Sequence, residues 1–170
     1  FYFIGSNTNP NLCSDTATLS ILVEGEANPV IISDSTICAG GTTTLFAAGG
    51  TTYEWFENGI PVGNGTSLVI NPTATSTYRL VATTDFGCTY DVEKTITVLD
   101  ELTVVAGTDT EICAEKSATI AAQTGFDSYN WVATPSGVTY AGVTSTGSPM
   151  MTTEYEVTGV DSNGCMATDT

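Results

Sequence analysis

The five cysteines are the residues of this sequence with the most distinctive chemistry. Cys13, Cys38, Cys88, Cys113 and Cys165 follow one another at spacings of 25, 50, 25 and 52 residues. These spacings contain no C-x2-C element of a structural zinc site, and the chain has no His to complete one. A cysteine nucleophile would also lack the His that usually serves as its base. We therefore predict no metal site, no catalytic thiol and no cofactor.

The acidic balance of the chain narrows the classes of partner. Nineteen Asp and Glu oppose three basic residues, Arg79, Lys94 and Lys116, so the formal net charge of the 170 residues is −16. Nucleic-acid binding requires clustered Lys and Arg, which this chain lacks, so we expect no nucleic-acid partner. No apolar stretch approaches the roughly 18 residues of a membrane helix, so we also expect no membrane insertion.

Enzymatic chemistry and calcium binding are not indicated either. Without His no Ser-His-Asp triad can form, and no two of the dispersed carboxylates stand apart as an acid–base pair. A D-x-D-x-D-G loop with a distal Glu, as in calcium-binding loops, is missing from the sequence. We predict that the protein is not an enzyme and that its acidic residues form a solvated, self-repelling surface.

Internal repetition accounts for the cysteine spacing. The segment "DSTICAGGTTTLFAA" (34–48) aligns with "DTEICAEKSATIAA" (109–122), and their cysteines are 75 residues apart. Likewise "TYEWFENG" (52–59) aligns with "SYNWVATP" (128–135), and "STYRLVATTDFGC" (76–88) with "TEYEVTGVDSNGC" (153–165). Residues 2–24 align with 78–101. We therefore divide the chain into the C-terminal strands of a preceding repeat (1–24), a complete repeat (25–100) and a third repeat (101–170) that lacks its complete last strand.

Each repeat has the pattern of short strands. Thr, Val, Ile and Tyr favour extended backbone, and the 17 Gly and six Pro are scattered like turn residues. We predict strands at 30–33, 42–48, 52–57, 67–70, 77–83 and 91–99, with a hairpin turn at "ENG" (57–59). The predicted fold class is all-β, with tandem Ig-like β-sandwich repeats of about 75 residues. Trp55 and Trp131 are the expected centres of the two cores.

Three segments carry a resemblance to a known family. "ICAGGTTTLFAAGGTTYEW", "PTATSTYRLVATTDFGC" and the final "TITV" strand resemble the Ig-like and PKD-like repeats of giant Bacteroidetes surface proteins, including SprB-type gliding-motility adhesins exported by type IX secretion. PKD domains proper carry W-x-F-G-D-G, from which "WFENG" and "WVATP" depart, so the resemblance favours the SprB-like branch. It implies an extracellular, cell-surface location and a repetitive stalk or filament that displays adhesive regions.

An extracellular location implies that the cysteines form disulfides. Two connectivities remain open. In one, the pairs lie within repeats, Cys38 with Cys88 and Cys113 with Cys165, and the partner of Cys13 precedes the sequence. In the other, Cys38 bonds Cys165 of the following repeat, while Cys88 reaches back and Cys113 reaches forward to neighbouring repeats.

Ig topology favours the pairing between repeats. Cys38 lies seven residues before Leu45 in one predicted strand, and Cys88 lies eight residues after Leu80 in another. These positions belong to opposite poles of a sandwich, tens of ångströms apart at about 3.3 Å per residue, whereas a disulfide needs Cα atoms within about 7 Å. In a head-to-tail array the two poles of adjacent repeats meet.

The sequence supports several further predictions. "DTA" (15–17) and "DST" (34–36) resemble a Bacteroidetes O-glycosylation signal at Thr16 and Ser35. The favoured function is a disulfide-stiffened stalk of a large surface adhesin, with neighbouring repeats of the same chain as partners. The alternative is a polysaccharide-binding module using the divergent segments 58–67 and 133–149. A third possibility is association of several copies in a fibre.

Overall fold

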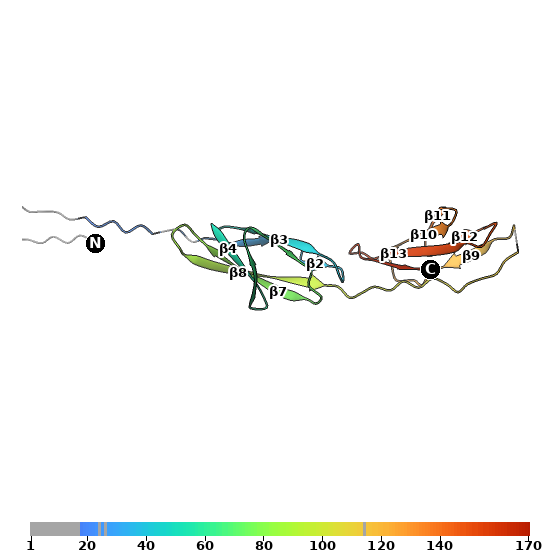
Figure 1. The fold of residues 1–170 in the computed structure, drawn as a ribbon, viewed down its shortest axis with the longest axis horizontal. Coiled ribbons are helices and arrows are strands. Elements are labelled where there is room, and N and C mark those ends of the chain that lie inside the picture. The colour runs from blue at the N-terminus through green and yellow to red at the C-terminus, as the bar shows by residue number, and fades with distance from the viewer. Residues whose placement is uncertain (1–17, 24, 26, 114) are drawn as a thin grey trace, which may run out of the picture.

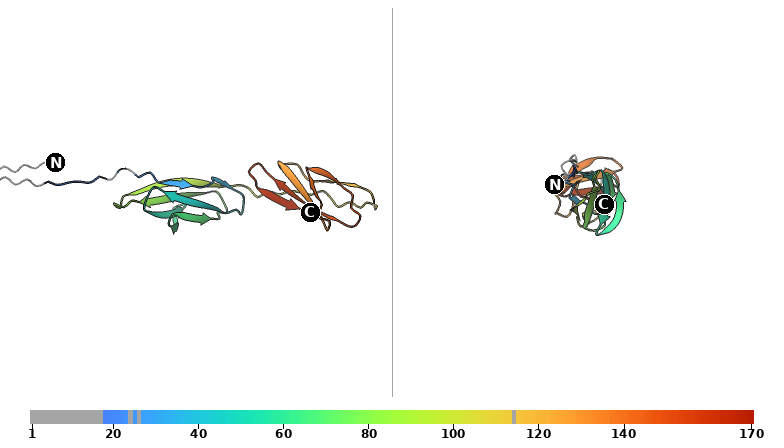
Figure 2. Two further views of the ribbon diagram at one scale, coloured as in Figure 1. Left: turned by 90° about the horizontal axis from the view of Figure 1, so that it is seen from above. Right: turned by 90° about the vertical axis from the view of Figure 1, so that its left-hand side faces the viewer.

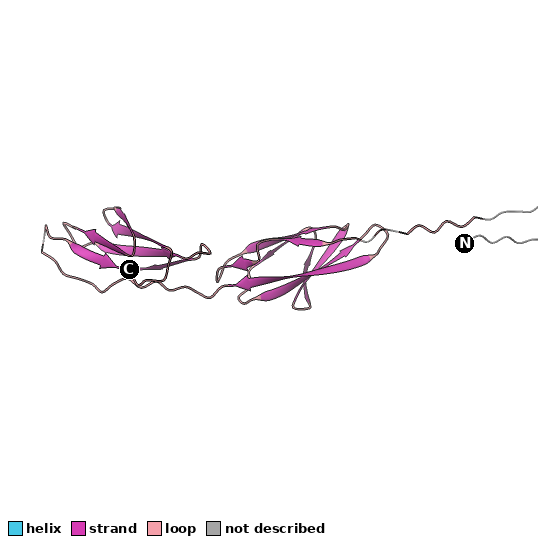
Figure 3. Ribbon diagram, turned by 180° about the vertical axis from the view of Figure 1, so that it is seen from behind, coloured by secondary structure: helices cyan, strands magenta, loops and turns pink. Residues whose placement is uncertain are grey.

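The computed structural model describes residues 18–23, 25, 27–113 and 115–170. Two β-sandwiches lie end to end along the long axis of the molecule (Figure 1), and they overlap when viewed along that axis (Figure 2). We call residues 27–99 the first sandwich and residues 104–170 the second sandwich. The described residues form strands and loops only, without any helix (Figure 3). Within this part of the chain, therefore, no helix is long and apolar enough to span a bilayer.

The first sandwich has sheets of three and five strands. The three-stranded sheet is antiparallel in the order β1-β3-β6, with β1 at Val30–Ile32, β3 at Thr43–Ala48 and β6 at Ser67–Ile70. The other has the order β2-β8-β7-β4-β5, with β2 at Thr36–Ile37, β8 at Thr89–Val98, β7 at Ser76–Thr83, β4 at Thr52–Glu57 and β5 at Ile60–Asn64. The short β2 pairs with β8 in parallel, while every other pairing is antiparallel. The arrangement is that of an Ig-like sandwich.

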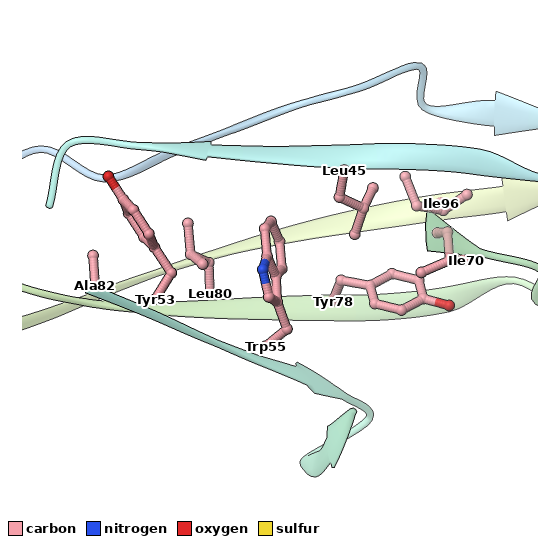
Figure 4. Packing of buried hydrophobic residues seen from close by; sticks show 8 residues of the cluster. All are labelled: Leu45, Tyr53, Trp55, Ile70, Tyr78, Leu80, Ala82 and Ile96. Carbon is pink, nitrogen blue, oxygen red and sulfur yellow. The ribbon is translucent and has the colours of Figure 1, made fainter. Parts of the chain in front are cut away.

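The core of the first sandwich follows from the alternation of its strands. In β7, Tyr78, Leu80 and Ala82 are buried, while the residues between them are half-buried. They meet Trp55 of β4 and Leu45 of β3 between the two sheets (Figure 4). Because successive side chains of a strand point to opposite faces, this period-2 burial means that each sheet has one face buried in the core.

The second sandwich repeats this plan with fewer residues in the core. One sheet has the order β11-β10-β13-β14, with β10 at Ser128–Thr134, β11 at Thr139–Ala141, β13 at Glu154–Val160 and β14 at Met166–Asp169. The other pairs β9, Ala118–Ala121, with β12, Thr144–Gly147. The buried residues of its hydrophobic cluster are Val104, Tyr129, Trp131 and Val157.

The predicted fold class is confirmed, and the six predicted strands correspond to β1, β3, β4, β6, β7 and β8. The "ENG" turn joins β4 to β5, with positive φ at Asn58 (47°) and Gly59 (86°). Trp55 and Trp131 are buried, as expected. The predicted strands of a preceding repeat, at 1–24, fall largely outside the described residues. Residues 18–23 are exposed and lie in no strand.

Candidate functional site

The strand β2 lies at the pole of the first sandwich that faces the second sandwich (Figure 1), and Cys38 directly follows this strand. The N–H of Gly41 donates to the Cys38 carbonyl at 2.9 Å and closes a tight turn. A side chain at position 41 would put its Cβ 2.9 Å from that carbonyl oxygen, so the turn requires glycine there. Asn71, which follows β6, donates its side-chain amide to the carbonyls of Gly40 and Gly41, both at 3.1 Å. The loop that carries Cys38 is thus tied to its own sandwich.

Cys165 lies in the turn between β13 and β14. The Asp161 carboxylate accepts hydrogen bonds from the N–H of Cys165 at 2.8 Å and of Asn163 at 2.9 Å. The Asp161 and Cys165 backbones are also bonded, N–H to carbonyl, at 3.0 Å, and Gly164 donates to the Asp161 carbonyl at 3.0 Å. Desolvation acts to raise the pKa of Asp161, but the hydrogen bonds from Cys165, Asn163 and Gly164 outweigh it and hold that pKa below its ordinary value.

A disulfide joins these two loops. Cys38 and Cys165 are bonded, with Cα atoms 5.6 Å apart and a sequence separation of 127 residues. Cys165 is buried and Cys38 is half-buried. This bond links two sandwiches, as the pairing between repeats requires. The pairs of the other scheme, Cys38 with Cys88 and Cys113 with Cys165, are not formed, and Cys88 and Cys113 are free and exposed.

The disulfide and the interdomain linker line one cavity of about 420 Å³. The linker contributes residues 100–103, and the second sandwich contributes Val104 and residues 165–168. Leu99 still bonds the Ile37 carbonyl of the first sandwich at 2.9 Å, and Val104 is already in the second core, so only residues 100–103 separate the two. Asp100 and Glu101 border the cavity, but no group of three or more His, Cys, Asp or Glu among the described residues is placed to hold a metal ion.

The two free cysteines lie in turns that match those of the bonded pair. In the β7–β8 turn, Thr84 donates its N–H to the Cys88 carbonyl at 2.9 Å and accepts from the Cys88 N–H through its side-chain oxygen at 3.2 Å. Asp161 makes the same two bonds to Cys165. In the second sandwich, Lys116 donates to the Cys113 carbonyl at 3.1 Å, as Gly41 does to Cys38. Each sandwich therefore presents one cysteine at each pole.

The other predicted positions are the remaining cysteine, the two candidate glycosylation sites and the two divergent segments. Cys13 and Thr16 are outside the described residues. Ser35 is exposed in the bend between β1 and β2, and its carbonyl accepts from Thr97 at 2.8 Å. Glycosylation at Thr16 and Ser35 stays a prediction. The divergent segments are largely strand, since 58–67 contains β5 and 133–149 contains β11 and β12. Polysaccharide binding through these segments also stays a prediction.

Sequence reasoning missed the residues that hold the two loops. The signal for Asp161 was present in "DSNGC", because an Asp two residues before Asn-Gly readily bonds the backbone ahead of it. Asn71 carried no such signal, since its partners Gly40 and Gly41 lie about 30 residues away in sequence and meet it only in the folded sandwich.

Residues 27–99 match the family model for the Ig-like domain CHU_C associated. This Ig-like match spans the first sandwich from its first strand to its last. No curated protein matches the chain. Among solved structures, the chain is similar to one from a study of host cell surface retention of a 1.5-MDa bacterial ice-binding adhesin, at 15% identity and a TM-score of 0.45. The match covers 86% of this chain and 63% of that chain, so the chain spans less than two thirds of that relative.

Proposed function

We propose that this chain is a segment of a non-enzymatic stalk in a large extracellular adhesin, and that disulfides between successive Ig-like domains carry tension along it. The Cys38–Cys165 disulfide across the joint is the observation on which the proposal rests. The Ig-like match of residues 27–99 supports a cell-surface location. In the finer form of the proposal, the adhesin is of the SprB type, exported by type IX secretion, and serves gliding motility.

The position of the disulfide determines which residues tension can reach. Pulling on the chain before residue 38 and after residue 165 loads a covalent path that passes directly through the sulfur atoms. Residues 39–164 lie inside the closed loop, and they include both tryptophans and most strands of both sandwiches. Unfolding inside the loop cannot lengthen that path, because the path bypasses the loop. The segment would hold its length even when a sandwich opens.

We extend the same pairing to the two free cysteines. Cys88, at the pole away from the joint, would bond a cysteine of the preceding repeat, and Cys113 would bond one of the following repeat. Their turns have the hydrogen bonds of the Cys165 and Cys38 turns, respectively. The neighbouring repeats of the same chain are then its covalent partners, and one disulfide spans every joint.

Single-molecule pulling through the two termini tests the proposal. The protein should carry C13S/C88S/C113S, so that Cys38 and Cys165 are its only cysteines and only the joint disulfide can form. Under reducing conditions, unfolding should release the 127-residue separation, roughly 420–460 Å at about 3.3–3.6 Å per residue. Under oxidising conditions that increment should disappear.

The matched control is the cysteine-free variant that also carries C38S/C165S. It should give the long increment with or without reductant. If the oxidised C13S/C88S/C113S protein lengthens as much as this control does, the disulfide does not carry the tension and the proposal is wrong.

A further inference from the structure

The outer face of the three-stranded sheet in the first sandwich is apolar and uncovered. Val30 and Ile32 of β1, Phe46 of β3 and Val69 of β6 are 39%, 59%, 51% and 72% exposed. Ile32 lies directly across from Phe46, and Val69 lies opposite Thr44, two residues from Phe46. Side chains at such directly opposite and diagonal positions are neighbours on a sheet. The four therefore form one patch, which we call the β1-β3-β6 face.

This face is also free of charge, unlike the opposite sheet. The strands β1, β3 and β6 read VII, TTLFAA and SLVI, without an ionisable side chain. The outward positions of the five-stranded sheet include Glu54, Asp91 and Glu93, all exposed. Two copies of a chain with a formal charge of −16 repel each other. They can approach through the β1-β3-β6 face without placing carboxylates opposite carboxylates.

The second sandwich shows that the fold does not require apolar residues there. In the first sandwich Phe46 follows the inward Leu45, and in the second Ala121 follows the inward Ile120. Val69 pairs with Thr44, whereas Thr146 pairs with the equivalent Thr119. Ala121 and Thr146 thus replace Phe46 and Val69, so the apolar surface is a property of the first sandwich alone.

We propose that the β1-β3-β6 face binds the same face of a second copy of this chain. This inference rests on the proposed stalk, since it assembles stalks side by side. Packing is sheet against sheet around a two-fold axis, so Phe46 and Val69 of each copy meet the apolar patch of the other. No patch residue bears a charge that would have to be desolvated.

The size of the face predicts a weak contact. The three strands hold three, six and four residues, which at about 3.3 Å per residue and about 4.8 Å between strands give a sheet area on the order of 200 Å² per copy. Stable interfaces bury about 800 Å² per partner, so this chain should dimerise only at high concentration. In a long stalk several such faces would act together, and the gain from multivalency makes the association useful.

Sedimentation velocity between about 10 µM and about 1 mM, a range suited to a small interface, tests this inference. Cys13, Cys88 and Cys113 are first capped with iodoacetamide to prevent mixed disulfides. The wild-type protein should shift from monomer towards dimer as concentration rises. Association should strengthen at about 0.5 M salt, where charges are screened within about 4 Å while apolar contact persists.

The variant F46T/V69T keeps β-forming side chains but removes the apolar patch, and its association should weaken at least tenfold. The matched control is I21T/L22T, which changes two apolar residues in segment 18–23 that are at least as exposed as Phe46, and it should leave association unchanged. A wild-type protein that stays monomeric in high salt, or an F46T/V69T protein that dimerises normally, would overturn the proposal. In the pulling experiment, F46T/V69T should still show the short extension that the disulfide allows. A failure of the lateral contact can therefore be distinguished from a failure of the proposed stalk.

Discussion

At the scale of single residues, one side-chain oxygen organises each cysteine turn between the last two strands of a sandwich. Asp161 supplies it in the second sandwich and Thr84 in the first, four residues before Cys165 and Cys88 respectively. The residue type differs, but both oxygens accept the N–H of the cysteine. Short polar side chains favour such local bonds, which fix the turn without help from the rest of the fold.

The ionisation of Asp161 predicts how the Cys165 turn responds to acid. Its folded pKa lies below the ordinary Asp value because the turn's N–H groups bond the carboxylate more strongly than desolvation penalises it. A depressed folded pKa contributes stability that is present above the unfolded pKa and is lost as pH falls through the folded pKa. We expect the amide proton of Cys165 to keep its native NMR shift below the ordinary Asp pKa, and to change only at lower pH.

The control for this titration is D161N, which keeps an acceptor oxygen but cannot ionise. Its Cys165 amide shift should be flat over the same pH range. A wild-type midpoint at or above the ordinary Asp pKa would contradict the predicted role of these hydrogen bonds.

At the scale of strands, predictability depends on whether a strand has one buried face. The long β7 and β8 alternate between more and less buried positions, so their period-2 pattern could be read from the sequence. Every residue of β5, IPVGN, is exposed, and it contains Pro and Gly, so it carried no such pattern. The two-residue β2 exists because β8 offers it a parallel edge, which only the folded sheet reveals.

The candidate site could likewise be predicted from the sequence only in part. The cysteines of the joint could be predicted because strand order places Cys38 and Cys88 at opposite poles, which argues against their pairing. The residues that hold the loops depend on contacts between distant segments or on the exact turn. Asn71 is the clearest case, because its two acceptors are set by the packing of the loop after β2 against the end of β6.

The two cores are predicted to respond separately to mutation once the joint disulfide is reduced. Leu80 is fully buried in the first core and Val157 in the second. L80A should cost the first sandwich about 2–5 kcal/mol of unfolding free energy, and V157A should destabilise only the second, by somewhat less. Trp55 and Trp131 provide one fluorescence reporter per core.

Urea denaturation followed by tryptophan fluorescence checks this prediction. The W131F variant leaves Trp55 as the reporter of the first sandwich, and W55F leaves Trp131 as the reporter of the second. Each reporter background must first be measured alone, since replacing a buried Trp also removes its hydrogen bond to Gly65 or Gly142. Loss of the Trp131 transition on L80A, under reducing conditions, would mean that the two cores form one cooperative unit.

At the scale of the whole molecule, two covalent connections cross the joint. One is the linker of residues 100–103, and the other is the Cys38–Cys165 disulfide. A short linker alone leaves two bodies free to bend and twist about it, whereas a second connection removes most of these motions. On the chain-entropy model, closing the loop also destabilises the unfolded chain by about 5 kcal/mol. The disulfide therefore affects both the shape and the stability of the pair.

The shape of the molecule should therefore depend on the redox state of one bond. In the C13S/C88S/C113S protein, small-angle X-ray scattering under oxidising conditions should give the end-to-end arrangement of Figure 1, with a narrow distribution of overall dimensions. Reduction should broaden that distribution while both tryptophans stay buried, because the cores do not contain the disulfide. The variant that adds C38S/C165S should look reduced in either condition. An oxidised profile identical to that of this variant would mean that the linker alone aligns the sandwiches, and the stiffness of the stalk would then depend on residues 100–103.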